Sequence, residues 1–436
     1  MKTVAFHTLG CKVNHYDSEA MMDLFKSRGY DIVSFNEMAD VYVVNSCTVT
    51  KEAARKSRQL ARKARRRNSE AVVALVGCYP QVSYDEVQRI EGIDIFIGTN
   101  NRADIVDFVE TFSKDGVIDY KVPQRDELSN YEELSIETLK ETTRAYVKIE
   151  EGCNQFCTYC IIPYARGPVR SRKPDLVIRE VQHLVEKGVK EIILTGTHLG
   201  AYGFDWREKN SLEELILELV QIEGLKHIRL SSIEVTEISE ELMDIIKSEK
   251  KLCPHLHLPL QSGSDGILRL MKRPYTTTEF RKVVEKIRTK IEDIAITTDI
   301  IVGFPGEEEE YFLENYNFAK EMAFSRLHIF PFSSLRGTPA AEMIQIPGNI
   351  KRNYSKKMLE LNRELMLNYQ QKFMGKVRKL IVEEERERET NFLVGMTDNY
   401  IRVLIDDDDN RYMGELVDVK LIKSLDYETV LGRIEN

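Results

Sequence analysis

The sequence predicts an α/β protein in three parts. These are a doubly wound parallel domain over residues 1–115, a partial barrel of six strand–helix units over 141–373, and a small antiparallel β-barrel over 374–436. Two observations lead to this fold class. Short Val- and Ile-rich runs alternate with helical segments as far as about residue 345, which is typical of parallel sheets covered by helices. The remaining C-terminal part has closely spaced β-rich runs separated by turn residues, which is typical of a small barrel.

In the first domain, the expected strands are apolar runs that each end in a polar turn. They cover residues 3–9, 41–45, 71–77 and 93–98. Helices are expected between them, one of them beginning near Ser18. Residues 116–140 are polar and weakly periodic, so we expect a linker with little structure of its own.

The central part alternates more regularly. The expected strands cover residues 145–149, 191–196, 227–232, 255–260, 295–303 and 327–332. Helical patterns such as 175–188 and 278–288 lie between them, and a long helical stretch follows at 350–373. In strand–helix barrels the active site lies at the carboxyl ends of the strands, so that edge is where functional side chains are expected.

Composition narrows the class of protein. The chain is 42% hydrophobic and 31% charged, with a net charge of −9. No apolar run approaches the roughly 18 residues of a membrane span, and the first residues do not resemble a secretory signal. We therefore expect a cytoplasmic protein without a membrane partner. The seven cysteines would then stand in a reducing compartment, which favours metal or redox roles over disulfides.

The sharpest motif is C-x3-C-x2-C, formed by Cys153, Cys157 and Cys160 directly after an expected strand. Three thiolates can ligate three irons of a four-iron cluster and leave the fourth iron open to a substrate. A zinc site with a missing fourth ligand is the alternative. The strand–loop setting at the mouth of a barrel favours catalysis, and no histidine lies within a few residues to complete a compact zinc site.

Three further cysteines, Cys11, Cys47 and Cys78, each follow an apolar strand of the first domain. In a parallel sheet all three would lie at the edge where a doubly wound fold places its ligand. An auxiliary iron–sulfur cluster is the functional interpretation, and three independent buried thiols are the alternative. Cys253 has no partner by spacing and is expected to be a packed thiol.

Taken together, these motifs resemble those of the radical S-adenosylmethionine methylthiotransferases. The resemblance is carried by GCNQFCTYCIIPYARG at 152–167, HLPLQSGSD at 257–265 and MKRPYT at 271–276. The stretches TGTH at 195–198 and IVGFPGE at 301–307 resemble cofactor-side motifs of the wider superfamily. The resemblance covers nearly the whole chain and implies that the C-terminal barrel is of the kind called TRAM.

The resemblance implies two [4Fe–4S] clusters and S-adenosylmethionine as cofactors. One S-adenosylmethionine would supply a methyl group to a sulfur at the auxiliary cluster. Another would be cut reductively to a radical that removes hydrogen from an unactivated carbon, where the methylthio group is attached. Cofactor contacts placed by strand order are Gly196, Gln261, Ser262, Gly303 and Phe330. A reducing electron donor and a sulfur source are implied partners.

Short sequence stretches such as TGTHLGAYG most resemble those of the group that acts on threonylcarbamoyladenosine at position 37 of tRNA. Isopentenyladenosine in tRNA and an aspartate of a ribosomal protein, the substrates of related groups, remain alternatives. An alternative from another class is a non-catalytic, zinc-stabilised RNA-binding protein.

A basic helix is expected just beyond Cys47. Residues 51–67 hold nine Lys or Arg and one acid, and Ala and Leu suit a helix. Spacings of three and four predict one shared face, made of Arg55, Arg58, Arg62, Arg65 and Arg66. Such a face could bind tRNA phosphates beside the active site, and a solvated surface helix is the alternative. In the C-terminal barrel acidic residues outnumber basic ones, so its RNA-binding role follows from the resemblance alone.

Overall fold

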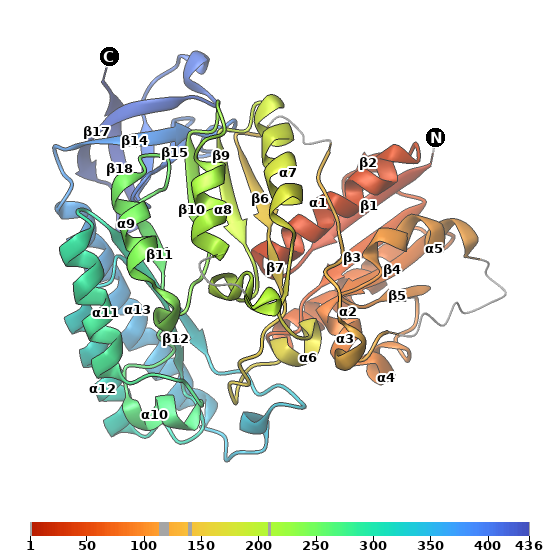
Figure 1. Ribbon diagram of the computed structural model, residues 1–436. Coiled ribbons are helices and arrows are strands. Elements are labelled where there is room, and N and C mark those ends of the chain that lie inside the picture. The colour runs from red at the N-terminus through yellow and green to blue at the C-terminus, as the bar shows by residue number, and fades with distance from the viewer. Residues whose placement is uncertain (1, 113–121, 138–141, 208–210, 436) are drawn as a thin grey trace.

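The computed structural model describes residues 2–112, 122–137, 142–207 and 211–435, which form three packed parts (Figure 1). The first is a five-stranded parallel sheet in the order β2-β1-β3-β4-β5. Its strands are β1 (Thr3–Thr8), β2 (Asp31–Val33), β3 (Val41–Ser46), β4 (Val72–Gly77) and β5 (Ile95–Ile97). Its helices are α1 (Lys12–Ser27), α2 (Lys51–Arg67), α3 (Cys78–Val82), α4 (Tyr84–Val87) and α5 (Ile105–Thr111), with the 3-10 turn η1 (Arg102–Asp104).

Alternation along the strands builds a core on each face of this sheet. Val4 and Phe6 of β1 join one buried cluster with side chains of α1 and α5, whereas Ala5 joins a second cluster with side chains of α2. The predicted doubly wound domain is therefore confirmed. Strand β2 was not predicted, because three half-exposed edge residues form no apolar run.

The second part is a partial barrel of six parallel strands. They are β6 (Arg144–Lys148), β9 (Glu191–Thr195), β10 (His227–Leu230), β11 (His255–His257), β12 (Ala295–Val302) and β13 (Arg326–Pro331). Their order follows the sequence, in two three-stranded sheets that single bridges between the β10 and β11 regions connect. The outer helices are α7 (Pro174–Glu186), α8 (Ser211–Leu219), α9 (Glu240–Ser248), α10 (Asp265–Leu270), α11 (Thr277–Lys290), α12 (Glu309–Met322) and α13 (Gly348–Gln371).

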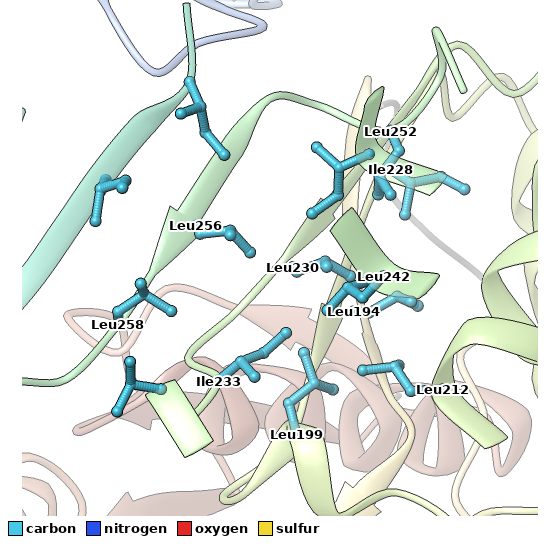
Figure 2. Close-up of a cluster of buried hydrophobic side chains, with 14 of the residues drawn as sticks. Leu194, Leu199, Leu212, Ile228, Leu230, Ile233, Leu242, Leu252, Leu256 and Leu258 are labelled. Atoms are coloured by element: carbon cyan, nitrogen blue, oxygen red, sulfur yellow. The ribbon is translucent and has the colours of Figure 1, made fainter. Parts of the chain in front are cut away.

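Leucine and isoleucine side chains from the strands and outer helices fill the barrel (Figure 2). Smaller elements line its rim: the pair β7 (Glu150–Glu151) and β8 (Arg170–Ser171), helix α6 (Ile162–Arg166), and 3-10 turns η3 (Leu199–Ala201), η4 (Phe204–Trp206), η5 (Val235–Glu237) and η6 (Pro339–Ala341). Helix α1 of the first domain packs against β6, so Tyr16 and Ala20 join the barrel core while Met21 and Phe25 of the same helix stay in the first domain. One helix thus joins two cores.

The third part is a closed five-stranded barrel in the order β14-β15-β16-β18-β17. Its strands are β14 (Val377–Val382), β15 (Leu393–Thr397), β16 (Arg402–Ile405), β17 (Leu416–Ser424) and β18 (Thr429–Ile434), with the 3-10 turn η7 (Asn410–Tyr412) before β17. Four pairings are antiparallel as expected, and β16 with β18 is parallel. Arg229 of β10 donates to the backbone oxygens of Thr397 and Asp398, which docks this barrel on the larger one. None of the helices in the described residues is long and apolar enough to cross a membrane.

The segment expected to be a linker is more ordered than its composition suggested. Residues 122–137 contain one short 3-10 turn, η2 (Arg125–Glu127), yet Leu134 and Ile136 are buried in the barrel core. The apolar residues that anchor this segment to the barrel core are irregularly spaced, so helical or strand periodicity in the sequence does not reveal them. The rest of the predicted linker, residues 116–121 and 138–140, lies outside the described residues.

Buried charges join the first domain to the barrel. Asp17 of α1 lies 2.6 Å from the Lys148 amine and also pairs with Arg102. Glu151 lies 3.0 Å from Arg102 and 2.5 Å from Arg166. All five side chains are at most 1% exposed. Burial alone would raise the pKa of Glu151, but the four surrounding cations, Arg102, Lys148, Arg166 and Arg170, outweigh it and hold this pKa well below the usual value.

We predict that Glu151→Ala destabilises the protein by about 3–5 kcal/mol, because it leaves buried cations without their counter-charge. Asp175→Ala, which removes an exposed ion pair with Arg179, should cost about 0–1 kcal/mol. Urea unfolding of both variants at pH 7 measures the difference. Since the folded-state pKa of Glu151 is lowered, its contribution should be present above about pH 4.3 and be lost as pH falls below that value. Equal stability of the two variants would contradict the prediction.

Candidate active site

The three cysteines of the first domain gather at one edge of its sheet. Cys11 directly precedes α1, Cys47 follows β3, and Cys78 begins α3 after β4. Strands β1, β3 and β4 are direct neighbours, so these residues leave the sheet side by side. Gly10 has φ +109°, and a Cβ there would lie 2.9 Å from Cys47 Cβ. The loops of Cys11 and Cys47 therefore meet at a distance that only glycine permits.

The thiols of this group influence one another. Burial, followed by the neighbouring Cys78 and Cys11 thiols, raises the pKa of Cys47 to about 12. The pKa of Cys78 is also raised, first by burial, with Cys11 adding to the effect and Arg166 opposing it. The raised pKa values of Cys47 and Cys78 mean that their thiolates need a nearby positive centre to form. This donor set fits the three-cysteine ligation of an iron–sulfur cluster.

The C-x3-C-x2-C loop runs from β7 to α6 at the carboxyl end of β6. Gly152 has φ +100°, and a Cβ there would lie 1.8 Å from the Pro168 backbone oxygen, so no other residue fits before Cys153. The Cys153 backbone N–H donates to the Gly167 oxygen at 3.0 Å, which closes the loop. Burial raises the pKa of Cys160 to about 12, with Cys157 and Cys153 adding to it. The three cysteines of this loop are therefore a second candidate donor set.

Arg273 contacts this loop from across the barrel. Its Nη1 donates to Cys157 Sγ at 3.4 Å, its Nε donates to the Tyr275 hydroxyl at 3.0 Å, and its Nη2 pairs with Glu234. Sequence reasoning did not identify Arg273, although the MKRPYT stretch that contains it was singled out. Tyr275 and Glu234 therefore hold this buried guanidinium against the Cys157 sulfur.

His198 contacts the loop at its other end. Its Nδ1 lies 3.6 Å from Cys153 Sγ and its Nε2 lies 2.7 Å from Glu237. The neighbouring Gly196, expected to touch the cofactor, also permits close packing of Glu150, because a Cβ would lie 2.6 Å from Glu150 Oε2. The His198 backbone N–H donates to that carboxyl at 2.7 Å, and burial raises the pKa of Glu150 to about 8.

A cavity of about 270 Å³ opens beside Cys160, between the first domain and the ends of β12 and β13. Its lining residues are Val49, Thr50, Tyr159, Cys160, Ile161, Gln261, Asp299, Ile301, Phe330, Pro331, Phe332, Ser333 and Leu335. Of the predicted cofactor contacts, Gln261 and Phe330 line it. Gln261 has φ +65°, which is uncommon for a residue with a side chain and is found at binding sites.

The other predicted contacts do not line this cavity. Ser262 is fully buried, and its hydroxyl accepts from the Ser264 N–H. Gly303 has φ +70°, and a Cβ there would lie 2.4 Å from Cγ of Lys351. Asp299 was missed, although an acidic residue within an otherwise apolar strand could have indicated a polar group aimed at a ligand.

Helix α6 connects the two cysteine sites. It begins just after Cys160 and packs against α3, which begins at Cys78. Arg166 at its end donates to Asn14 Oδ1, and Asn14 Nδ2 donates to the backbone oxygens of Leu9 at 2.6 Å and Ser46 at 3.1 Å. Those oxygens belong to the Cys11 and Cys47 loops. The position of one cysteine set therefore determines that of the other.

The basic helix forms as expected, with Thr50 accepting from the Ala53 N–H at its start. The arginines predicted to share one face of this helix fall into two groups in the structure. Arg65 pairs with Asp94 at 2.5 Å and Arg58 pairs with Glu86 at 3.0 Å, so both also brace the first domain.

The other three arginines of this face are exposed. Arg55 is paired with Glu52, whereas neither Arg62 nor Arg66 forms an ion pair with any described residue. Arg62 and Arg66 are therefore the members of the predicted face that are free to meet an anion.

Cys253 is buried, as expected of a packed thiol. It stands with Glu191 and His227, and the three ligand atoms lie within 4.8 Å of one another at the opposite end of the barrel. Arg229 and Arg144 lie within 3.0 Å and 2.5 Å of the Glu191 carboxylate, whose charge they already balance.

Comparison with known proteins agrees with this architecture. Residues 3–98 match the model described as "Uncharacterized protein family UPF0004", and residues 147–319 match the "Radical SAM superfamily". A solved structure of the radical S-adenosylmethionine methyltransferase TsrM from Kitasatospora setae is similar in fold, with a TM-score of 0.57 and 16% identity. The match covers 78% of this chain and 77% of that one.

Curated relatives match over nearly the full length. The threonylcarbamoyladenosine tRNA methylthiotransferase MtaB of Bacillus subtilis is 44% identical, covering 97% of this chain and 94% of its own. That of Aquifex aeolicus is 40% identical, covering 92% and 100%. The tRNA-2-methylthio-N(6)-dimethylallyladenosine synthase of Clostridium tetani is 34% identical, covering 98% and 95%. The chain therefore belongs to the radical S-adenosylmethionine tRNA methylthiotransferases.

Proposed function

We propose that this protein attaches a methylthio group to C2 of N6-threonylcarbamoyladenosine at position 37 of tRNA. The observation that carries the reaction is the pair of three-cysteine sites joined through α6. The substrate rests on similarity: relatives named for threonylcarbamoyladenosine are 38–44% identical, and those named for dimethylallyladenosine are 33–36% identical.

Each cysteine set would hold a [4Fe–4S] cluster. Cys153, Cys157 and Cys160 would ligate the cluster that faces the cavity, and the first-domain set of Cys11, Cys47 and Cys78 would ligate the auxiliary one. When bound, the two clusters and S-adenosylmethionine would supply the radical, the methyl group and the sulfur. The geometry supports this assignment because both sets leave a strand end, and the cavity lies against the domain that carries the auxiliary set.

Protein side chains would position the reactants. Arg273 would hold Cys157 through its Nη1 hydrogen bond, and His198 would hold Cys153 through the Glu237 contact. Gln261 and Asp299 present polar groups to the cavity where a bound cofactor could donate or accept hydrogen bonds. The apolar remainder of the lining would exclude water, which limits quenching of a reactive intermediate.

Partners follow from this chemistry. The radical step needs a reducing electron donor, and repeated turnover needs a sulfur source. Helix α2 begins at the cavity wall, and its exposed arginines would bind backbone phosphates of the tRNA. A tRNA-modifying enzyme of this kind would act in the cytoplasm.

Nucleoside mass analysis of tRNA from cells with and without the gene tests the proposal. Loss of 2-methylthio-N6-threonylcarbamoyladenosine, with accumulation of its unthiolated precursor, is the expected result. If a methylthio derivative of isopentenyladenosine disappears instead, the substrate assignment is wrong and the reaction stands. If no nucleoside changes, the aspartate of a ribosomal protein becomes the candidate substrate.

Single cysteine variants should separate the two sites. Cys153→Ala should abolish formation of 5′-deoxyadenosine, because the cavity-side cluster would lose a ligand. Cys47→Ala should retain deoxyadenosine formation and lose methylthiolation. Cys253→Ala serves as the control and should retain both activities. Chromatography of the two products in anaerobic reactions measures this, and full methylthiolation by Cys47→Ala would exclude an auxiliary cluster at that site.

Charge reversal on α2 should weaken tRNA binding. Arg62→Glu with Arg66→Glu should lower affinity and flatten its dependence on salt by about 1.4 in the log–log slope, at about 0.7 per phosphate contact. Filter binding across a salt series measures both quantities. Binding equal to that of the unaltered protein at low salt would make α2 an ordinary solvated helix.

A further inference from the structure

A second basic surface lies on the other side of the cavity mouth. It is a groove of about 700 Å³ between α13 and the end of β13. Its lining residues are Ile329, Pro331, Gly348, Lys351, Arg352, Ser355, Lys356, Leu359, Glu360 and Arg363. Positions 352, 356, 359 and 363 recur at helical spacing, so they form one stripe along α13.

The stripe carries free positive charge. Arg352, Lys356 and Arg363 are exposed, and together with Lys351 they face a single acid, Glu360. Within the described residues none of the four cations forms a salt bridge, whereas exposed arginines elsewhere, such as Arg179, do. In a chain with a net charge of −9, such a cluster favours an anionic ligand.

The groove is continuous with the mouth of the active-site cavity. Pro331 lines both hollows. The Lys51 backbone N–H, at the start of α2, donates to Ser333 Oγ at 3.2 Å. The pKa of Lys351 is lowered, first by burial and then by the positive charge of the nearby Lys51. Helices α2 and α13 therefore both begin at the mouth of the cavity. Along each helix lie cations that form no salt bridge with any described residue.

We propose that the α13 groove binds the sugar–phosphate backbone of the tRNA on one flank of the target adenosine, while α2 binds the other flank. This inference rests on the proposed function. When the target base is inserted into the cavity, the RNA backbone continues on both sides of it. The basic surfaces of α2 and α13 would each bind the backbone on one side. The stripe from 351 to 363 spans about 18 Å, at about 1.5 Å per residue, which is long enough for its cations to contact several successive phosphates of one strand.

The groove variant combines Arg352→Glu, Lys356→Glu and Arg363→Glu. Its matched control combines Lys187→Glu, Lys282→Glu and Lys372→Glu, three exposed lysines outside the groove, and has the same net charge. Both are prepared anaerobically as full chains, and circular dichroism and the thermal midpoint establish that they fold. The probe is tRNA that carries threonylcarbamoyladenosine without the methylthio group.

At about 0.1 M salt the groove variant should bind this tRNA at least tenfold more weakly than the control. Its log–log salt slope should be flatter by about 2, because three phosphate contacts contribute about 0.7 each. Hydroxyl-radical footprinting should show lost protection on one flank of position 37, and the Arg62→Glu, Arg66→Glu variant should lose it on the other.

Binding by the groove variant equal to that of the control would overturn the inference. The proposed function would then still stand if the α2 variant bound weakly. Failure of the unaltered protein to bind this tRNA would overturn both. Protection lost on the same flank in both variants would also reject the division of the backbone between α2 and α13.

Discussion

A buried ionic cluster joins the first domain to the barrel, and the relative position of the two cysteine sites depends on it. Asp17, Arg102, Lys148, Glu151 and Arg166 come from α1, η1, the β6–β7 segment and α6, and water reaches none of them. Removing charges from water is costly, so each member must find its partners. In the structure all five side chains pair with a partner of opposite charge across the contact between the two domains.

The same contact has a consequence for chemistry. Arg166 ends the helix that begins after Cys160, and through Asn14 it holds the backbone of the Cys11 and Cys47 loops. Sulfur transfer of the proposed kind needs its two centres on opposite sides of one substrate. The buried ionic cluster would provide that alignment without a large interface between the cysteine loops themselves. The cavity wall formed by Val49 and Thr50 shows that the first domain also closes the site.

Much of this architecture could be predicted from sequence, because parallel strands read as apolar runs and their carboxyl ends share an edge. All six barrel strands and strands β1, β3, β4 and β5 of the first domain were found in this way. Strand β2 and the last strand, β18, were missed: one is short and half exposed, and the other has buried and exposed positions without a continuous apolar run. The packing of residues 122–137 depends on partners that local periodicity does not contain.

The cysteines were identifiable because their spacing carries chemistry by itself. The side chains around them were harder. Strand order indicated which loop ends near the cofactor, and it did not reveal that Gly196 packs on Glu150 or that Gly303 packs on Lys351. Arg273 and His198 reach the thiols from loops distant in sequence. On α2, helical spacing predicted a shared basic face, and Asp94, which neutralises Arg65, arrives from beside β5.

Electron paramagnetic resonance of the reconstituted, reduced protein tests the central claim most directly. Two four-iron clusters held on either side of α6 should give about eight irons per chain and a spectrum broadened by coupling between the two spins. Removal of either cysteine set should leave a single uncoupled signal with half the iron. A colourless protein with zinc in place of iron, or one uncoupled cluster in the unaltered chain, would contradict the account.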